Sequence, residues 1–200
     1  MTFGQLSFDE TYKGADLTAP RGLLYVPDAI APETERSLLD AIDAREWITS
    51  MSRRVQHYGW KYDYKARRVS PDSYLGPLPS FLAPLVTLAQ GRAGFMPDQA
   101  IVNEYEPGQG IAPHVDCEPC FGPTIAMVGL GSSTQIDFAH CATGRTWSLR
   151  FGQRGLLVIE DEARTAWTHG IAKRRSDPGV AGRRERRVSV TLRTVVAVPG

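Results

Sequence analysis

Cysteine and net charge are both scarce in this 200-residue chain, and each scarcity excludes a class of protein. Three cysteines, an odd number, do not suggest the disulfide framework of a small secreted domain. A formal net charge of +1 gives no overall preference for nucleic acid or for anionic surfaces. The remaining composition, 42% hydrophobic and 22% charged, is that of an ordinary globular protein with a core of reasonable size.

Long apolar runs, internal repeats and linker-like segments are missing as well. No stretch approaches the roughly 18 apolar residues of a membrane-spanning helix, and the N-terminus lacks the basic start and apolar core of a secretory signal. We therefore expect a soluble cytoplasmic protein without membrane contact. A polar, weakly patterned arm at residues 1–20 should precede a single domain over residues 21–200.

Two helices are predicted in the N-terminal half. Residues 32–47 carry an apolar stripe at helical spacing, and Pro32 suits the first turn of that helix. Residues 80–93 predict the second helix, with Ser80 as a candidate N-terminal cap and Pro84 in the first turn.

From residue 99 onward the sequence changes to short strand-like runs that are separated by glycine, proline or charge. The runs are AIVNEY, TIAMVGLG, TQIDF, RTWSL, GLLVIE, TAWTHGI and RVSVTLR, and GLLYV at residues 22–26 is a further strand candidate. Seven or eight short strands at this spacing predict a mainly β fold, either a sandwich or a double-sheet jelly roll. The two helices would then cover one outer face.

Two histidines and an aspartate form the clearest candidate site. His114 and Asp116 are alternate residues, so on an extended strand both side chains project to the same face. His169 follows 53 positions after Asp116. Two histidines and one carboxylate suit a non-haem Fe(II) that keeps coordination positions open. A His-x-Asp pair alone is more often a surface or structural feature, so the interpretation depends on the third ligand and on the arginines nearer the C-terminus.

Two arginines lie at the ends of the last strand-like run. Arg187 and Arg193 are six residues apart, so they share one face of an extended strand. An inward-facing arginine without a partner is costly, and a bound dicarboxylate would remove that cost. The alternative is a basic strand whose charges are solvated.

Four motifs together resemble the signature of the AlkB family of Fe(II)/2-oxoglutarate dioxygenases. They are Asn103-x-Tyr105-x-x-Gly108, His114-x-Asp116, His169-Gly170-Ile171 and Arg187-x-x-x-x-x-Arg193, in the family's order. The resemblance implies a double-stranded β-helix over residues 98–196 and a lid segment at about residues 50–75. The stretches NEYEPGQGIAPHVD and WTHGI are most similar to the AlkB-like domain of the tRNA wobble-uridine-modifying branch.

The resemblance also implies a role for each matched residue. His114, Asp116 and His169 would hold Fe(II), which works with 2-oxoglutarate and O2. Arg187 matches the partner of the distal carboxylate of 2-oxoglutarate, and Arg193 matches the arginine near the chelating end. Further co-substrate contacts would come from three polar side chains, Asn103, Tyr105 and Ser189. Ser189 departs from the family pattern, because several relatives carry asparagine there.

The implied reaction is the oxidation of a modified or alkylated base in nucleic acid. Oxidative decarboxylation of 2-oxoglutarate gives succinate and carbon dioxide, and a substrate carbon is hydroxylated. A hydroxylated N-methyl group is lost as formaldehyde, whereas a hydroxyl on an ordinary carbon stays. Two alternatives remain open: the same cofactors acting on a protein side chain or small metabolite, and a binding module without turnover.

The segment from residue 53 to residue 68 mixes aromatic and basic side chains. Cations can pair with phosphates while aromatic faces stack on an unpaired base, so single-stranded DNA or RNA, with tRNA among the candidates, is the expected partner. The candidate substrate residues are Arg53, Arg54, His57, Tyr58, Trp60 and Tyr62. The alternation of Tyr58, Trp60, Tyr62 and Tyr64 predicts that all four share one face of a strand, which core packing in a hairpin would also produce.

Cys117-x-x-Cys120 has the spacing of a zinc-binding pair, with His140 and Cys141 as further candidate ligands. The four residues do not form two matched pairs, and Cys117 directly follows the iron ligand Asp116. We therefore expect buried or loop thiols rather than a second metal site.

Overall fold

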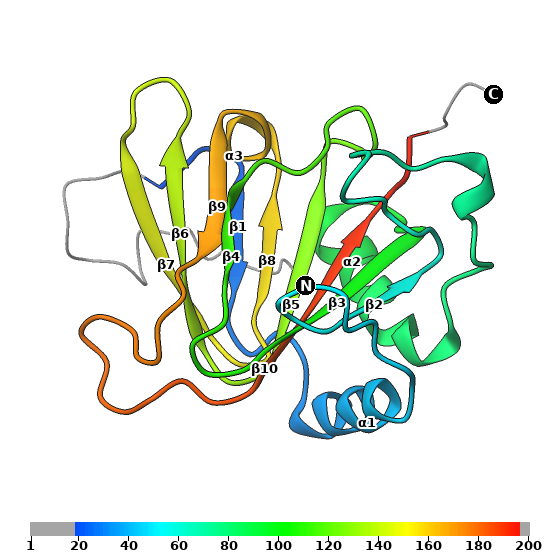
Figure 1. Cartoon of the computed structure of the whole chain (residues 1–200), viewed down its shortest axis with the longest axis horizontal. Coiled ribbons are helices and arrows are strands. Elements are labelled where there is room, and N and C mark those ends of the chain that lie inside the picture. Colours follow the sequence, from blue (N-terminus) through cyan, green and yellow to red (C-terminus); the bar gives the residue numbers. More distant parts are fainter. Residues whose placement is uncertain (1–18, 197–200) are drawn as a thin grey trace, which may run out of the picture.

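Two antiparallel β-sheets lie face to face in the computed structural model, which describes residues 19–196 (Figure 1). The larger sheet has the order β1 (Leu23–Val26), β8 (Leu156–Ile159), β5 (Ile125–Gly131), β10 (Arg187–Arg193), β3 (Gln99–Tyr105) and β2 (Val55–Tyr58). The smaller sheet has the order β4 (Ile111–His114), β9 (Trp167–Ile171), β6 (Thr134–His140) and β7 (Thr146–Phe151). This arrangement confirms the predicted jelly roll.

The inner faces of the two sheets enclose one hydrophobic cluster. The larger sheet contributes Ile125 and Met127, and the smaller sheet contributes Phe138, Phe151 and other buried side chains. Alternation along each strand puts every second residue on this inner face. The predicted metal ligands line a cavity whose wall also includes Met127 and Ile136 of this cluster.

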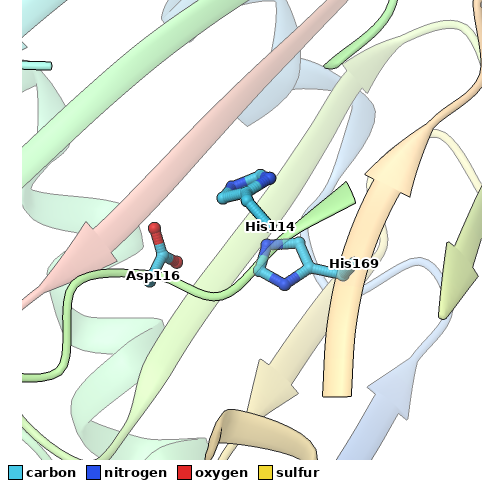
Figure 2. Close-up of side chains that lie close together, drawn as sticks. All are labelled: His114, Asp116 and His169. Atoms are coloured by element: carbon cyan, nitrogen blue, oxygen red, sulfur yellow. The ribbon is translucent and has the colours of Figure 1, made fainter. Parts of the chain in front are cut away.

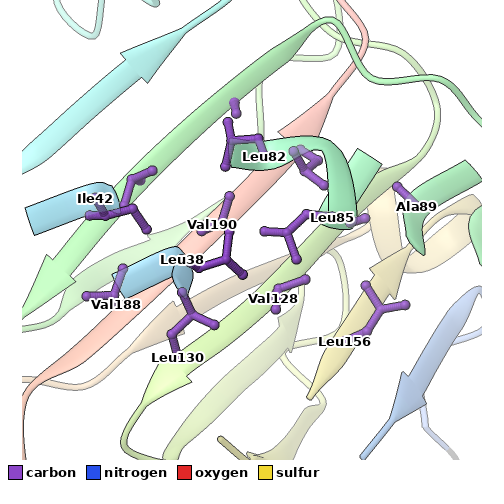
Figure 3. Close-up of a cluster of buried hydrophobic side chains, with 14 of the residues drawn as sticks. Leu38, Ile42, Leu82, Leu85, Ala89, Val128, Leu130, Leu156, Val188 and Val190 are labelled. Carbon is purple, nitrogen blue, oxygen red and sulfur yellow. The ribbon is translucent and has the colours of Figure 1, made fainter. Parts of the chain in front are cut away.

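The outer face of the larger sheet is covered by α1 (Pro32–Asp43) and α2 (Ala83–Ala93), as predicted (Figure 1). Figure 3 shows helix side chains such as Leu38 and Leu85 over Val128 and Val190 of the sheet. These contacts fix the position of β5 and β10, and therefore of the polar residues on the opposite face of β10.

The helix boundaries differ from the expected ones at two points. α1 ends at Asp43, with Ala44 as its C-terminal cap, and does not continue to residue 47. The chain turns there because Ile48 pairs with Val55 in a short β-bridge. Ser80 does not cap α2: it starts the 3₁₀ turn Ser80–Leu82, where Pro79 occupies the cap position.

A third, short helix, α3 (Asp161–Thr165), links β8 to β9. Over residues 19–196, no helix has both the length and the apolar character needed to cross a membrane. The expected N-terminal arm at residues 1–20 lies outside the described residues, apart from its last two positions.

Candidate metal and co-substrate site

The pairing of β4 with β9 brings two predicted metal ligands together. His114 lies directly opposite His169, and the two ring centroids are 4.5 Å apart. The register shifts between Ile111 and His114, so β4 carries a bulge within its short length. Gly170 permits this arrangement, because a β-carbon there would lie only 2.9 Å from the backbone nitrogen of Pro113.

Asp116 completes the group just beyond the end of β4. One potential ligand atom from each of His114, Asp116 and His169 lies within 4.8 Å of the others. Figure 2 shows the three side chains close together, with His114 at the end of β4, His169 on β9 and Asp116 on the loop that follows β4. Asp116 belongs to the loop after β4, so the alternation expected from the sequence extends two residues past the strand itself.

Hydrogen bonding and burial prepare both imidazoles for metal binding. Nδ1 of His114 lies 2.9 Å from the carbonyl oxygen of Ala112, which can only accept, so Nδ1 is the donor and Nε2 is the ring nitrogen that remains for a metal. Burial lowers the pKa of His169 to about 4, and the neighbouring His114 contributes to this shift. His169 is therefore neutral at physiological pH, which is the state that binds a metal.

Asp116 is held as a carboxylate by an arginine. Burial opposes ionisation of Asp116, but the surrounding positive charges, that of Arg193 foremost, together outweigh it, and the pKa of this carboxyl lies below its ordinary value. Arg193 Nη1 donates to Asp116 Oδ1 at 3.0 Å, and Arg193 Nε donates to Gln99 Oε1 at 2.9 Å. One carboxylate oxygen is therefore oriented by the protein and the other remains for a ligand.

Arg164 is a residue that the sequence did not single out. It is buried in α3, and its Nη1 donates to the carbonyl oxygen of Asp116 at 2.9 Å. The bond fixes the backbone of the loop that carries the metal ligand. A lone arginine five residues before His169 has no spacing signal, so only the three-dimensional structure assigns it this role.

The three ligands open into a cavity of about 680 Å³ between the sheets. β10 lines it with alternate residues, whereas Val188, Val190 and Leu192 of the same strand point into the core beneath the helices. The cavity walls include Arg187, Ser189, Thr191 and Arg193 from β10, and Ile101, Asn103 and Tyr105 from the neighbouring β3. The predicted common face of Arg187 and Arg193 is thus present.

Arg187 lies in this cavity as a buried cation with unused donors. Its Nη1 donates to the carbonyl oxygen of Ser132 at 2.8 Å, but among the described residues Nε and Nη2 have no hydrogen-bond partner. Burial lowers the pKa of Arg187 to about 10, so the side chain stays charged at neutral pH. The guanidinium stacks over the ring of Phe151, 4.6 Å from its centroid. A carboxylate is the group that these free donors fit.

The other predicted co-substrate residues also lie in the cavity wall. Ser189 faces Asn103 across the β10–β3 pair, and Arg187 faces Tyr105. Asn103 Oδ1 accepts a hydrogen bond of 2.8 Å from Arg53 Nε. Burial raises the pKa of Tyr105, so its hydroxyl is a neutral donor.

The predicted common face of four aromatic residues in the lid segment is wrong. β2 ends at Tyr58, and Gly59 has a φ of +74°, which turns the chain out of the strand. Tyr62 and Tyr64 line the cavity. Tyr58 packs instead against Phe81 on the helix side of the sheet, with ring centroids 5.4 Å apart.

The predicted substrate residues therefore separate into two groups. Arg53 and Tyr62 line the 680 Å³ cavity, and His57 lines an adjoining cavity of about 500 Å³ that shares the Tyr62 wall. Arg54 pairs with Glu104, and Trp60 packs on Tyr74. Arg54, Tyr58 and Trp60 are not part of the wall of either cavity.

Cys117 and Cys120 are joined by a disulfide, which corrects the expectation of free thiols. Cys141 is an exposed free cysteine. Within residues 19–196, His114, Asp116 and His169 form the one group of three or more potential metal ligands, so the zinc arrangement with His140 is not present.

Comparison with known proteins decides the family. A model of the 2OG-Fe(II) oxygenase superfamily matches residues 25–193. The chain belongs to this superfamily. Membership implies Fe(II) and 2-oxoglutarate. The two imidazoles and the carboxylate fit the metal, and the free donors of Arg187 fit the co-substrate.

Curated relatives place the chain with the AlkB-like members of the superfamily. It is 38% identical over 165 residues to the "tRNA (carboxymethyluridine(34)-5-O)-methyltransferase alkbh8" of Xenopus tropicalis, covering 79% of this chain and 26% of that protein. It is 34% identical over 209 residues to the "Alkylated DNA repair protein ALKBH8 homolog" of Arabidopsis thaliana, covering 90% and 60%. The chain therefore spans less than two thirds of either relative.

A solved structure supports the fold alone. The structure of OsALKBH1 superimposes with a TM-score of 0.69 at 14% identity, covering 89% of this chain and 98% of the other.

The acid stability of the metal-free oxygenase should report on His57. Burial lowers the pKa of His57 to about 4, as it does for His169, so both imidazoles stay neutral in the fold at pH values where they are protonated in the unfolded chain. The free energy of unfolding should therefore keep its highest value above pH 6.5 and decrease as the pH drops towards 4. His57→Phe should lower the slope of the free energy of unfolding against pH by about 1.4 kcal/mol per pH unit, which corresponds to one proton. Urea unfolding at several pH values with a chelator measures the slope, and an unchanged slope would contradict the assignment.

Proposed function

We propose that this oxygenase uses Fe(II), 2-oxoglutarate and O2 to oxidise a modified base in nucleic acid, with the anticodon region of tRNA as the first substrate to test. The observation that carries the proposal is the opening of the ligand group and the unused donors of Arg187 into one cavity. The products are a hydroxylated or N-demethylated base, succinate and carbon dioxide.

One group of residues would bind the metal, and another would bind its co-substrate. His114, Asp116 and His169 would hold Fe(II), which together with 2-oxoglutarate and O2 supplies the oxidising power for a C–H bond. Arg187 would bind the distal carboxylate with two parallel hydrogen bonds. Arg193 would keep one oxygen of Asp116 engaged, so that the other oxygen would be left for the metal.

The substrate end of the cavity is formed by the lid segment. Tyr62 and Tyr64 supply aromatic faces, and Arg53 and Arg67 supply cations, all in the cavity wall. Stacking and charge suit an unpaired base with its phosphate. Similarity to the Xenopus and Arabidopsis proteins supports nucleic acid as the substrate class. The methyltransferase activity in the first name belongs to a much longer protein and is not proposed for this chain.

A nucleoside survey tests the proposal. Total tRNA, methylated single-stranded RNA and methylated single-stranded DNA are incubated with enzyme, Fe(II) and 2-oxoglutarate, then digested and compared by mass spectrometry. We expect one base to change and succinate to form in proportion. His114→Ala should abolish both. Succinate formation without any base change would instead favour a protein or small-molecule substrate, and the absence of succinate under every iron loading would sink the enzyme assignment.

The position of Arg187 yields a prediction about Gly129. A β-carbon at Gly129 would lie 2.7 Å from Nη2 and 2.8 Å from Nη1 of Arg187, and 3.0 Å from the carbonyl oxygen of Gly152. Gly129→Ala should displace the guanidinium of Arg187 from its position beside Gly129. Since overpacking costs about 1–3 kcal/mol, 2-oxoglutarate binding should weaken by about tenfold or more. Titration calorimetry with Mn(II) in place of Fe(II) measures the affinity.

Gly91→Ala is the matched control for that experiment. Gly91 lies in α2, and a β-carbon there meets no atom within 4 Å. The control should bind 2-oxoglutarate normally. Equal affinity in both variants would show that the guanidinium of Arg187 does not bind 2-oxoglutarate.

A further inference from the structure

The Cys117–Cys120 disulfide connects the metal-ligand loop to the lid. Cys117 follows Asp116 directly in the sequence and is partly exposed, whereas Cys120 is only 5% exposed. The two residues between them, Glu118 and Pro119, are exposed. One sulfur of the pair is therefore open to attack from solvent and the other is protected.

Both sulfur atoms lie against one carbonyl group of the lid. The carbonyl oxygen of Arg67 is 3.4 Å from Sγ of Cys117 and 3.5 Å from Sγ of Cys120. A carbonyl oxygen only accepts hydrogen bonds, and a disulfide sulfur carries no hydrogen to donate. A thiol does carry one. These contacts can therefore become hydrogen bonds only when the pair is reduced.

The residues around the disulfide belong both to the lid and to the loop that carries Asp116. Cys120 is buried with Val69 and Phe121, and Tyr62 of the lid packs against the same small cluster. Arg164 donates to the carbonyl oxygen of Cys117 as well as to that of Asp116. The two sulfur atoms therefore contact the lid, and Cys117 belongs to the loop that carries Asp116. A chemical change at the sulfur atoms can thus affect both segments.

The bridge is poorly suited to a purely stabilising role. It closes a loop of only three residues' separation, and the stabilisation from a disulfide falls with the length of the loop it closes. The exposed Cys141 remains unpaired, so the chain does not rely on a disulfide framework. Short, isolated bridges with one accessible sulfur are typical of reversible redox pairs.

We propose that Cys117 and Cys120 form a reversible thiol–disulfide site whose reduction anchors the lid over the cavity through the carbonyl group of Arg67. The site goes beyond the proposed base oxidation, because it needs neither the substrate nor turnover.

The redox step balances with an external dithiol. A thiolate of the dithiol attacks Sγ of the more accessible Cys117, and the S–S bond breaks to release Cys120, which takes up a proton. The second thiol of the reagent then displaces Cys117, so that two electrons reduce the pair and the reagent becomes a disulfide. In the reverse direction hydrogen peroxide oxidises Cys117 to a sulfenic acid with loss of water. Cys120 then displaces a second water and restores the bridge.

Thiol counting tests the redox pair itself. The full-length protein is equilibrated in buffers of reduced and oxidised dithiothreitol, alkylated and analysed by peptide mass spectrometry, with Cys141→Ser as the matched control variant. We expect the peptide with Cys117 and Cys120 to change together between no label and two labels, with one midpoint. Two labels under all conditions, or no label until the protein unfolds, would overturn the proposal.

Hydrogen exchange tests the consequence for the lid. The amide groups of Asp63 and Arg68 bond across a tight turn that includes Arg67, so they report on how firmly this turn is held. In metal-free protein we expect these amides to exchange several-fold more slowly when the pair is reduced. The double variant with Cys117→Ala and Cys120→Ala should show the faster rate in both buffers, and Cys141→Ser should behave like the original protein.

The comparison of reduced and oxidised original protein needs no substitution, so a folding defect in the double variant cannot obscure the result. Equal exchange in the two states would exclude lid anchoring. Because both measurements are made without substrate, their failure is separate from any failure of the base-oxidation proposal.

Discussion

Replacing Arg187 with methionine is expected to weaken 2-oxoglutarate binding by about two to three orders of magnitude and, at the same time, to stabilise the metal-free protein. Loss of one partner of a buried charge pair in a complex costs about 2–5 kcal/mol. In the free protein Arg187 is 2% exposed as a residue, and its guanidinium keeps two donor nitrogens without partners in the described structure. Removing it there relieves a desolvation cost.

The opposite signs make this experiment informative. Replacing a buried, incompletely paired charge with an apolar side chain is often stabilising by about 1–4 kcal/mol. For a chain of this size, a gain of about 1 kcal/mol raises Tm by about 2–4 °C. Calorimetric titration with Mn(II) and thermal unfolding of the metal-free protein measure the two effects. Arg187→Lys should keep the charge but lose the two-pronged contact, so its affinity should lie between the two extremes.

Arg183→Met is the matched control, because Arg183 is exposed in the loop just before β10. It should change neither affinity nor stability. If Arg187→Met bound 2-oxoglutarate normally, the carboxylate would have to lie elsewhere in the cavity. If it destabilised the metal-free protein, the bond from Arg187 to Ser132 would outweigh the cost of burying the cation.

The part of the site on β10 was predictable because strand periodicity is local. Arg187 and Arg193 alternate with Val188, Val190 and Leu192, and a period of two in a buried strand fixes which face each residue occupies. The same reasoning placed the helices over the outer face, since their apolar stripes needed a partner surface.

The aromatic pattern of the expected lid segment, residues 50–75, could not be predicted in the same way. Alternating aromatics at residues 58–64 have the period of a strand, but Gly59 adopts a left-handed φ and ends it. The next aromatics then pack against loop partners that are distant in sequence, such as Phe121. The disulfide was not predicted because an odd number of cysteines argues against a disulfide framework but not against one short bridge.

The two arginines of β10 have different energetic roles although they share one face. Among the described residues Arg187 has no ion-pair partner, so its buried charge lowers the stability of the free protein and is suited to binding a carboxylate. Arg193 already has its anion in Asp116, with exposed side-chain fractions of 4% and 12% for the two partners. The structure therefore predicts that removing the charge at one end of the strand stabilises the metal-free protein, whereas breaking the pair at the other end destabilises it.

Asp116→Ala is accordingly expected to abolish metal binding and turnover and also to unfold more easily without metal. Breaking a buried ion pair by removing one partner costs about 3–5 kcal/mol, because the other charge stays buried and unpaired. A loss of about 3 kcal/mol corresponds to a fall in Tm of about 6–12 °C for a chain of this size. Metal content after Co(II) loading and thermal unfolding with a chelator measure the two effects.

His114→Ala separates the two roles of Asp116. It removes a metal ligand but no ion pair, so it should lose Co(II) binding and keep nearly the original Tm in the metal-free state. The double variant with Asp116→Ala and Arg193→Met should regain much of the lost stability, since no unpaired charge remains, yet it should still bind no metal. If the double variant were less stable than Asp116→Ala alone, the bond from Arg193 to Gln99 and its stacking on Phe121, 3.8 Å from the ring centroid, would be the dominant contribution of this arginine.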